Sequence, residues 1–462
     1  MTSRLTFPKL SRRSFIKIGA GLVATAAGYV LPKALLTPVE AAAPPVNTVP
    51  NKHLAATDGW IKIPGRDMYT GSAQIHPDPY APNGASTYVF GFADVTRFNG
   101  VRDQVFAQKM GAWHTAPVID VDQEADFWLK LTNLGFVMRP DLTDAHTVHW
   151  HGFKNAIPMF DGEPHSSMGV SIGSELMYYY KPHDPGTYMF HCHVEETEHI
   201  HMGMTGVAYV RALQNQGAGP AVPARLAGAA AGPGVPMGYA YNDGVAAYAD
   251  RSTAYDREFL LIFTEVWAYM HWCDAHIQLV DWTDYQADFY LINGRAYPDT
   301  LLPNHDPYDP AWADTAMQHQ PHSALIQATA GERVLLRLVN LGFKPITVTA
   351  PGLTFRAVGR DASLLRGLVN GARTGADLSF VTHDLNLNAG ETWDAIFTAP
   401  TPATYDDLDD QGRSCKKYLL YNRSLYQVSN GDLDGSLGGQ LTEVRVYPAG
   451  VLPLQSQANE LG

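Results

Sequence analysis

Histidine and cysteine are common metal ligands, and this chain concentrates them in one stretch. Nine of its 18 histidines fall between His146 and His201, whereas it has only three cysteines in all. So few cysteines exclude a disulfide scaffold and a thiolate-rich zinc or iron–sulfur protein. Most of the clustered histidines belong to two motifs. Residues 146–152 read His-Thr-Val-His-Trp-His-Gly, and residues 191–204 begin with His-Cys-His and end with Met-Gly-Met.

Both motifs lie in stretches that read as β-strands, where alternate side chains share a face. His191 and His193 then point to one side and Cys192 to the other. The first motif has the same alternation. This predicts two sites back to back. One is a histidine face made of His149, His151, His191 and His193. The other is a thiol site made of His146 and Cys192, with His199, Met202 and Met204 in the loop that follows.

The two sites differ in the chemistry that their side chains allow. A cysteine thiolate, two imidazoles and a weak methionine are typical of a blue-copper electron-transfer site, whereas a cluster of imidazoles suits copper that binds oxygen. A lone cysteine with methionine nearby is not the usual ligand set of zinc. Because Cys192 is bonded between His191 and His193, an electron at the thiolate has a short covalent route to the histidine face.

The two motifs resemble those of the multicopper oxidases. The pattern His146-x-x-His149-x-His151-Gly152 is similar to one family motif. The segment from His191 to Met204 is similar to another, with two extra residues before His199, and this insertion leaves His201 and Met202 as alternative ligands. The resemblance implies type 1 copper at His146, Cys192, His199 and Met204, type 2 copper at His149, and type 3 copper at His151, His191 and His193.

The resemblance also implies an enzyme. It would take electrons from a small-molecule or metal-ion reductant, or from a redox protein, and pass them to dioxygen. In the family, the trinuclear copper centre lies between two domains that each supply four histidines. Residues 344–350 and 418–424, where the second set is expected, contain no histidine. Two-domain relatives form homotrimers, so the resemblance implies a homotrimer or a partner subunit. Because every copy of this chain lacks the second set, a different subunit would have to complete the centre, or a smaller copper site would serve. Two alternatives are a type 1 copper electron-transfer or copper-binding protein without oxygen reduction, and an enzyme like copper nitrite reductase.

An internal repeat predicts how the chain is organised. The sequence Leu-Thr-Asn-Leu-Gly-Phe at 131–136 recurs as Leu-Val-Asn-Leu-Gly-Phe at 338–343, and the segment 173–188 parallels 390–405. Short alternating runs between glycine and proline turns indicate an all-β protein built of β-sandwiches. We expect domains at 50–212 and 251–450, joined by a flexible, Gly/Ala/Pro-rich linker at 213–250. The resemblance implies that both are cupredoxin-like Greek-key sandwiches, the second without copper ligands.

Several other polar residues have weaker interpretations. We expect His165, His183 and His201 at the surface or behind the ligands, and His319 and His322 in a surface loop. The acidic residues Asp144, Glu195, Glu196 and Glu198 suggest a solvated loop, with orientation of the ligand histidines as the alternative. Cys273 and Cys415 either form a disulfide or remain two buried thiols.

The N-terminus predicts export. A twin-arginine pair at Arg12 and Arg13 precedes a short apolar stretch and an Ala-Ala-Ala site, so residues 1–43 read as a twin-arginine signal peptide. We therefore expect a periplasmic or extracellular protein. Its net charge of −13 makes nucleic acid an unsuitable partner.

Overall fold

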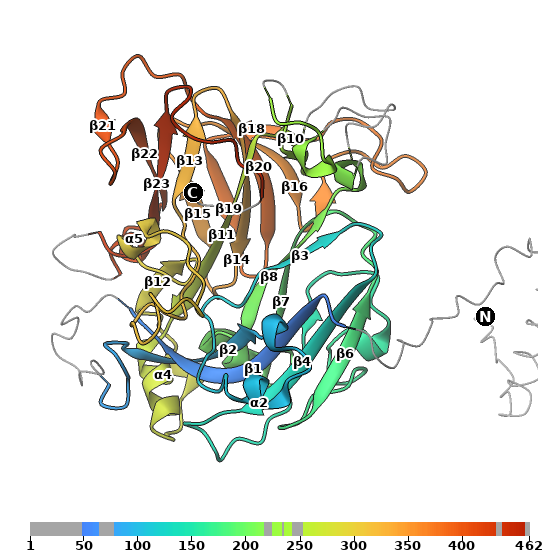
Figure 1. The fold of residues 1–462 in the computed structure, drawn as a ribbon, viewed down its shortest axis with the longest axis vertical. Coiled ribbons are helices and arrows are strands. Elements are labelled where there is room, and N and C mark those ends of the chain that lie inside the picture. Colours follow the sequence, from blue (N-terminus) through green and yellow to red (C-terminus); the bar gives the residue numbers. More distant parts are fainter. Residues whose placement is uncertain are drawn as a thin grey trace, which may run out of the picture. The chain divides into compact units, whose positions relative to one another are not determined.

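The fold was analysed in a computed structural model that describes residues 49–63, 78–216, 224–232, 235–242, 253–430 and 437–457 (Figure 1). The predicted signal peptide lies outside these residues. Strands dominate the described chain, so the predicted all-β class is confirmed. None of the described helices is long and apolar enough to cross a membrane.

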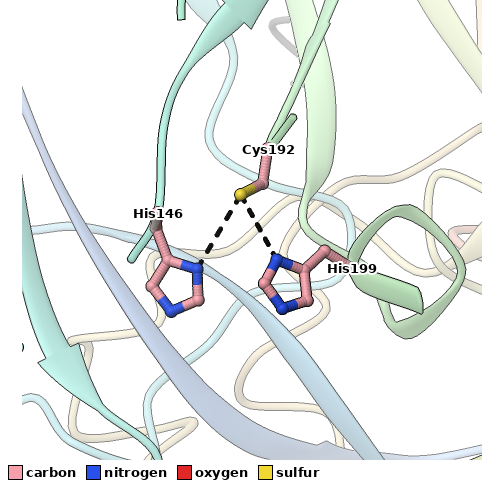
Figure 2. Close-up of side chains that lie close together, drawn as sticks. All are labelled: His146, Cys192 and His199. Atoms are coloured by element: carbon pink, nitrogen blue, oxygen red, sulfur yellow. Dashed lines mark hydrogen bonds between the residues drawn. The ribbon is translucent and has the colours of Figure 1, made fainter. Parts of the chain in front are cut away.

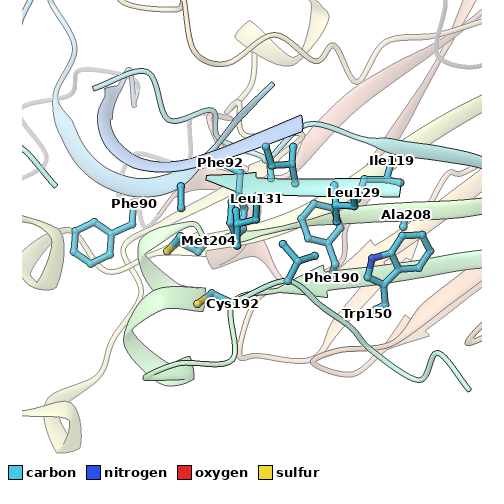
Figure 3. Close-up of a cluster of buried hydrophobic side chains, with 14 of the residues drawn as sticks. Phe90, Phe92, Ile119, Leu129, Leu131, Trp150, Phe190, Cys192, Met204 and Ala208 are labelled. Atoms are coloured by element: carbon cyan, nitrogen blue, oxygen red, sulfur yellow. The ribbon is translucent and has the colours of Figure 1, made fainter. Parts of the chain in front are cut away.

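The first half of the chain forms two four-stranded sheets. In sheet order, one sheet contains β2 (Thr87–Asp94), β1 (Lys52–Ile61), β4 (Phe127–Gly135) and β6 (Glu175–Tyr180). The other contains β3 (Ile119–Asp122), β8 (Thr205–Arg211), β7 (Gly186–His191) and β5 (His149–Trp150). Buried side chains from both sheets, such as Leu129, Leu131 and Phe190, pack into one core that reaches Cys192 and Met204 (Figure 3).

The second half forms two larger sheets with a core of their own around Leu336, Phe355 and Val444. One sheet contains β12 (Phe289–Ile292), β11 (Arg257–Val266), β14 (Arg333–Asn340), β20 (Thr392–Thr398), β16 (Phe355–Arg360), β17 (Ser363–Leu364) and β18 (Phe380–Thr382). The other contains β13 (Ile326–Thr329), β23 (Leu441–Tyr447), β22 (Ser414–Asn422), β15 (Ile346–Thr349), β19 (Asp384–Leu387) and β21 (Asp407–Leu408).

Short helices connect these strands. They are α2 (Arg102–Phe106), α3 (Glu196–Met202), α4 (Ala268–Ala275) and α5 (Leu425–Ser429). Helix α3 links β7 to β8, and α5 links β22 to β23, so the same strand–helix–strand unit occurs in both halves.

The repeated motif has the same structural role in both halves. Asn133 ends β4, and its side-chain oxygen accepts the backbone N–H of Gly135 at 2.8 Å. Asn340 ends β14 and accepts the N–H of Gly342 at 3.0 Å. The second predicted repeat holds only at its start, because Tyr188 lies in β7 whereas Tyr405 lies in the loop before β21. Extra chain between β20 and β22 therefore displaces the later part of the match.

The linker at 213–250 stays a prediction, and the part of it that the structure describes contains a paired strand and buried side chains. β9 (Gly238–Tyr239) pairs with β10 (Ala254–Tyr255), and both Tyr239 and Tyr241 are buried. The hydroxyl of Tyr241 donates to Asp394 at 2.6 Å. The aromatic residues anchor this segment although glycine and alanine surround them in the sequence.

Buried charges join the two halves. Glu258 of β11 contacts Arg337 of β14 and lies 3.2 Å from Arg211 of β8. Arg337 also donates to the hydroxyl of Thr187 in β7 at 2.9 Å, and that hydroxyl donates to Asp394 at 2.6 Å. Residues 49–462 form one compact unit, and the domain borders proposed from the sequence stay a prediction.

Candidate metal centre

Two adjacent antiparallel strands position the histidine motifs. β5 pairs with β7 so that His149 lies opposite His191. Cys192 follows directly after β7, and its backbone N–H donates to the carbonyl of Met204 at 3.0 Å. This register produces the predicted arrangement, with Cys192 in the core of the first half and the histidine face on the other side of the strand.

The thiol site brings three predicted ligands together (Figure 2). The Sγ atom of Cys192 lies 3.3 Å from Nδ1 of His199 and 3.8 Å from Nδ1 of His146. The backbone N–H of Thr147 points at the same sulfur at 3.5 Å. All three ligand atoms lie within 4.8 Å of one another, as a single metal ion requires.

The electrostatics of the thiol site favour a thiolate. Burial alone would raise the pKa of Cys192, but hydrogen bonds from His146 and His199 outweigh it and hold this pKa well below its ordinary value. Burial opposes the charge on His199 as well, yet Asp144 and Cys192 raise the pKa of His199 to about 10. The thiolate is the form of cysteine that binds metal, so the residues present fit a metal ion with cysteine and imidazole ligands.

The structure separates the alternative ligands. His201 does not face Cys192, because its Nε2 accepts the backbone N–H of Trp267 at 3.0 Å. Met204 lies beside Cys192 in the core, and its N–H donates to the carbonyl of His199 at 2.8 Å (Figure 3). The geometry therefore favours His199 over His201, and the choice of Met204 over Met202 stays a prediction.

The histidine face is a looser cluster. The distance between ring centroids is 5.0 Å for His149 and His193, 5.3 Å for His149 and His191, and 6.2 Å for His151 and His191. Burial lowers the pKa of His191 to about 3, and burial also lowers the pKa of His151. These two imidazoles are therefore neutral near pH 7, which is the state that binds metal.

Three rings of the histidine face are fixed through Nδ1. His149 donates to the carbonyl of Asp161 at 2.6 Å, and His191 donates to the carbonyl of Cys192 at 2.9 Å. His193 lies 2.8 Å from the carboxylate of Glu196. These contacts leave each Nε2 as the nitrogen with a free lone pair. His151, His191 and His193 line a cavity of about 530 Å³.

The acidic run behaves partly as expected. Glu195 and Glu196 are exposed, but Glu196 begins helix α3 and contacts His193. Asp144 lies 3.7 Å from Nε2 of His199 and is only partly exposed. Glu196 and Asp144 therefore fit the alternative interpretation, in which they orient histidines, better than the interpretation of a solvated loop.

The remaining predictions have mixed outcomes. His165 and His183 are exposed and pair with Glu163 and Glu124, which confirms the expected surface position for both. His201 is buried, so a surface position is wrong for it. His319 and His322 lie in a loop, as expected, but they are only partly exposed, and burial lowers their pKa values to about 4 and about 3. Cys273 and Cys415 are free, buried thiols, so the disulfide alternative is wrong.

Hydrogen bonds align the thiol site with a matching place in the second half. The N–H of Cys192 donates to the carbonyl of Met204, and the N–H of Asn422 donates to the carbonyl of Gln440 at 3.1 Å. Met204 donates to the carbonyl of His199, and Gln440 donates to the carbonyl of Gln427 at 3.0 Å. Asn422, Gln427 and Gln440 thus stand where the first half has Cys192, His199 and Met204.

Amide side chains occupy the position in the second half that matches the thiol site. The side-chain amide of Asn422 donates to the side-chain oxygen of Gln427 at 2.5 Å and to that of Gln440 at 2.8 Å. The side-chain oxygen of Asn422 accepts the N–H of Thr347 at 3.3 Å, as the sulfur of Cys192 accepts that of Thr147. We call these three residues the amide cluster. Amides at this spacing carry no metal signature, so no sequence pattern predicts this cluster.

The counterpart of the histidine face has no histidine either. Thr349 pairs with Tyr421 in the second half as His149 pairs with His191 in the first. The same alignment places Pro351 and Arg423 at the positions of His151 and His193. The second half therefore lacks a ligand set at both places.

Comparisons with known proteins agree with this geometry. Residues 110–215 match the family model described as multicopper oxidase. Among solved structures, the blue copper oxidase from Nitrosomonas europaea is 17% identical, covers 85% of both chains and gives a TM-score of 0.51. The multicopper oxidase mgLAC is 16% identical, covers 87% of both chains and gives a TM-score of 0.52. No curated protein matches the sequence. Residues 110–215 thus match the multicopper oxidase model, and the chain shares a cupredoxin-type fold with these solved structures.

Proposed function

We propose that the protein is a copper-dependent oxidoreductase of the multicopper oxidase type. The observation that carries this proposal is the thiol site, where His146, Cys192 and His199 converge. All three side chains are buried, and they lie in the segment that matches the family model. In this proposal, those three residues and Met204 hold type 1 copper. Bound copper would supply one-electron redox chemistry.

The chain's own residues prepare such a site. The contacts to Cys192 keep its sulfur as a thiolate before any metal binds, and burial excludes water from it. The peptide bond from Cys192 to His191 gives an electron a short covalent route to the histidine face. There His149, His151, His191 and His193 would hold copper of type 2 or type 3.

A complete trinuclear centre does not fit this chain by itself. The histidine face provides four ligands, and the positions that match it in the second half hold threonine, proline, tyrosine and arginine. A homotrimer repeats the same deficit. Reduction of dioxygen therefore requires histidines from a partner subunit or a smaller copper centre at the histidine face.

The electron donor is proposed by class alone. It is a small-molecule or metal-ion reductant, or a redox protein, and the proposed acceptor is dioxygen. Export by the twin-arginine route would deliver the folded protein to the periplasm or the exterior.

Copper content and spectra test the proposal together. We expect a blue protein with more than one copper per chain, an EPR spectrum with a blue copper signal, and oxygen uptake in the presence of a reductant. A blue protein with one copper per chain and no oxygen uptake would refute the oxidase. That result would support the second candidate, an electron carrier, which the amide cluster and the incomplete ligand set favour. Failure to bind copper would refute both.

Glu196 gives a sharper test of the histidine face. Glu196→Ala removes the carboxylate that fixes Nδ1 of His193, and loss of such an outer partner weakens metal binding by roughly 10- to 100-fold. We expect this decrease for Cu²⁺ bound at the histidine face, measured by titration in a Cys192→Ser background that removes the thiol site. Glu124→Ala, at an exposed carboxylate paired with His183, is the control. Equal affinity for both variants would contradict the role of Glu196.

A further inference from the structure

The cavity at the histidine face has an unusual opposite wall. The second half contributes Leu341, Gly342 and Phe343, which follow β14, and Ala389 and Gly390, which precede β20. None of these five residues has a side chain that binds metal. The wall comes close to the histidines, because a side chain at Gly390 would begin 3.9 Å from a ring carbon of His151 and 3.3 Å from the methyl group of Met189.

The composition of the lining resembles a binding site for a small organic molecule. Met189 and Ile200 add apolar surface from the first half, and the polar groups are confined to the histidines, Glu196 and two threonines. Ligand pockets typically have volumes of about 300–1,000 Å³, mostly apolar walls and a few polar groups that fix orientation. The volume here is about 530 Å³, which falls within that range.

The space is not shaped to complete a metal cluster. The residues that match the histidine face in the second half are Thr349, Pro351, Tyr421 and Arg423, and none of them is among the residues that line this cavity. The cavity wall is instead built from the two turns of the internal repeat. An apolar wall thus lies opposite the three histidines that line the cavity.

We infer that this cavity binds a small, uncharged aromatic molecule next to the histidine face. Its ring would pack against Phe343, Leu341 and Met189, and one edge would face the imidazoles. The inference deepens the proposed function and rests on it in one respect, namely that the histidine face holds copper. Binding to the apolar wall itself needs no metal.

The test uses the full-length protein and 4-fluorotoluene, an aromatic probe with no charged or metal-binding group. Binding to the metal-free protein is measured by ¹⁹F NMR line broadening. Ala389→Phe places a ring in the cavity from an exposed loop position, and we expect it to weaken binding at least tenfold. Ala403→Phe makes the same change at an exposed alanine outside the lining and should leave binding unchanged.

Two outcomes overturn the inference: no binding to the metal-free protein, or equal binding by wild type and Ala389→Phe. After loading with Cu²⁺, the fluorine signal of the bound probe should broaden further, because the paramagnetic ion lies beside the cavity. The blue colour and the copper content of the same sample report on the proposed function separately. If copper does not bind, the proposed function fails, while the metal-free measurement still decides whether the cavity binds the probe.

Discussion

Cys192→Ser protein should fold normally and lose its blue colour completely. The blue absorption of type 1 copper depends on a cysteine thiolate ligand, and a serine hydroxyl does not replace it. Cys192 is the one cysteine near His146 and His199, since Cys273 lies in α4 and Cys415 in β22. The visible spectrum of the copper-loaded variant measures the loss, and circular dichroism checks the fold.

The other two cysteines provide matched controls for this experiment. Cys273→Ser and Cys415→Ser each remove a buried thiol, as Cys192→Ser does, and both variants should remain blue. A blue Cys192→Ser protein would refute the ligand assignment. Loss of colour in a control variant that stays folded would show that the thiolate ligand is another cysteine.

Glu258→Gln should lower the free energy of unfolding by about 3–5 kcal/mol, the range found when one partner of a buried ion pair is removed. Glu258 is 1% exposed and contacts Arg337 and Arg211, which are buried as well. Glutamine has almost the same shape but no charge, so two buried guanidinium groups would lose their shared carboxylate. Chemical denaturation of the metal-free protein measures the change.

Asp306→Asn is the matched control, because it removes one charge from the exposed pair with Arg97. Exposed pairs contribute about 0–1 kcal/mol, so this variant should unfold nearly as wild type does. Equal effects of the two substitutions would contradict the importance of the buried network.

The buried network also predicts a dependence on pH. Burial opposes the charge of Glu258, but Arg337 and Arg211 outweigh it and lower the pKa of this carboxyl in the folded protein. The stabilisation is therefore complete above the ordinary pKa of glutamate and is lost as the pH falls through the lowered value. Wild type should lose this stability on acidification, whereas Glu258→Gln lacks it at every pH.

The sequence predicted the centre of the site well because local rules determine it. Alternation along a strand places Cys192 and His191 on opposite sides, and the repeat at 338–343 marks the end of β14 as that at 131–136 marks the end of β4. Both features depend on neighbours within a few residues. The all-β class followed from the same short-range patterns.

What the sequence could not predict depends on contacts between distant segments. His201 is buried because the backbone of Trp267 meets it, and the segment at Tyr239 and Tyr241 is ordered because it packs on the second half. The partial burial of His319 and His322 likewise involves distant residues, since His114 donates to the carbonyl of His319 and Trp113 packs against His322. Composition alone made these segments look exposed or flexible.

The amide cluster gives the chain an internal reference for its own metal site. Asn422, Gln427 and Gln440 show which side chains let this strand–helix–strand unit close through hydrogen bonds alone. They therefore indicate how a metal-free first half could be made, with the substitutions Cys192→Asn, His199→Gln and Met204→Gln. Comparison of this triple variant with the copper-loaded wild type would separate what copper contributes to the fold from what the scaffold achieves alone.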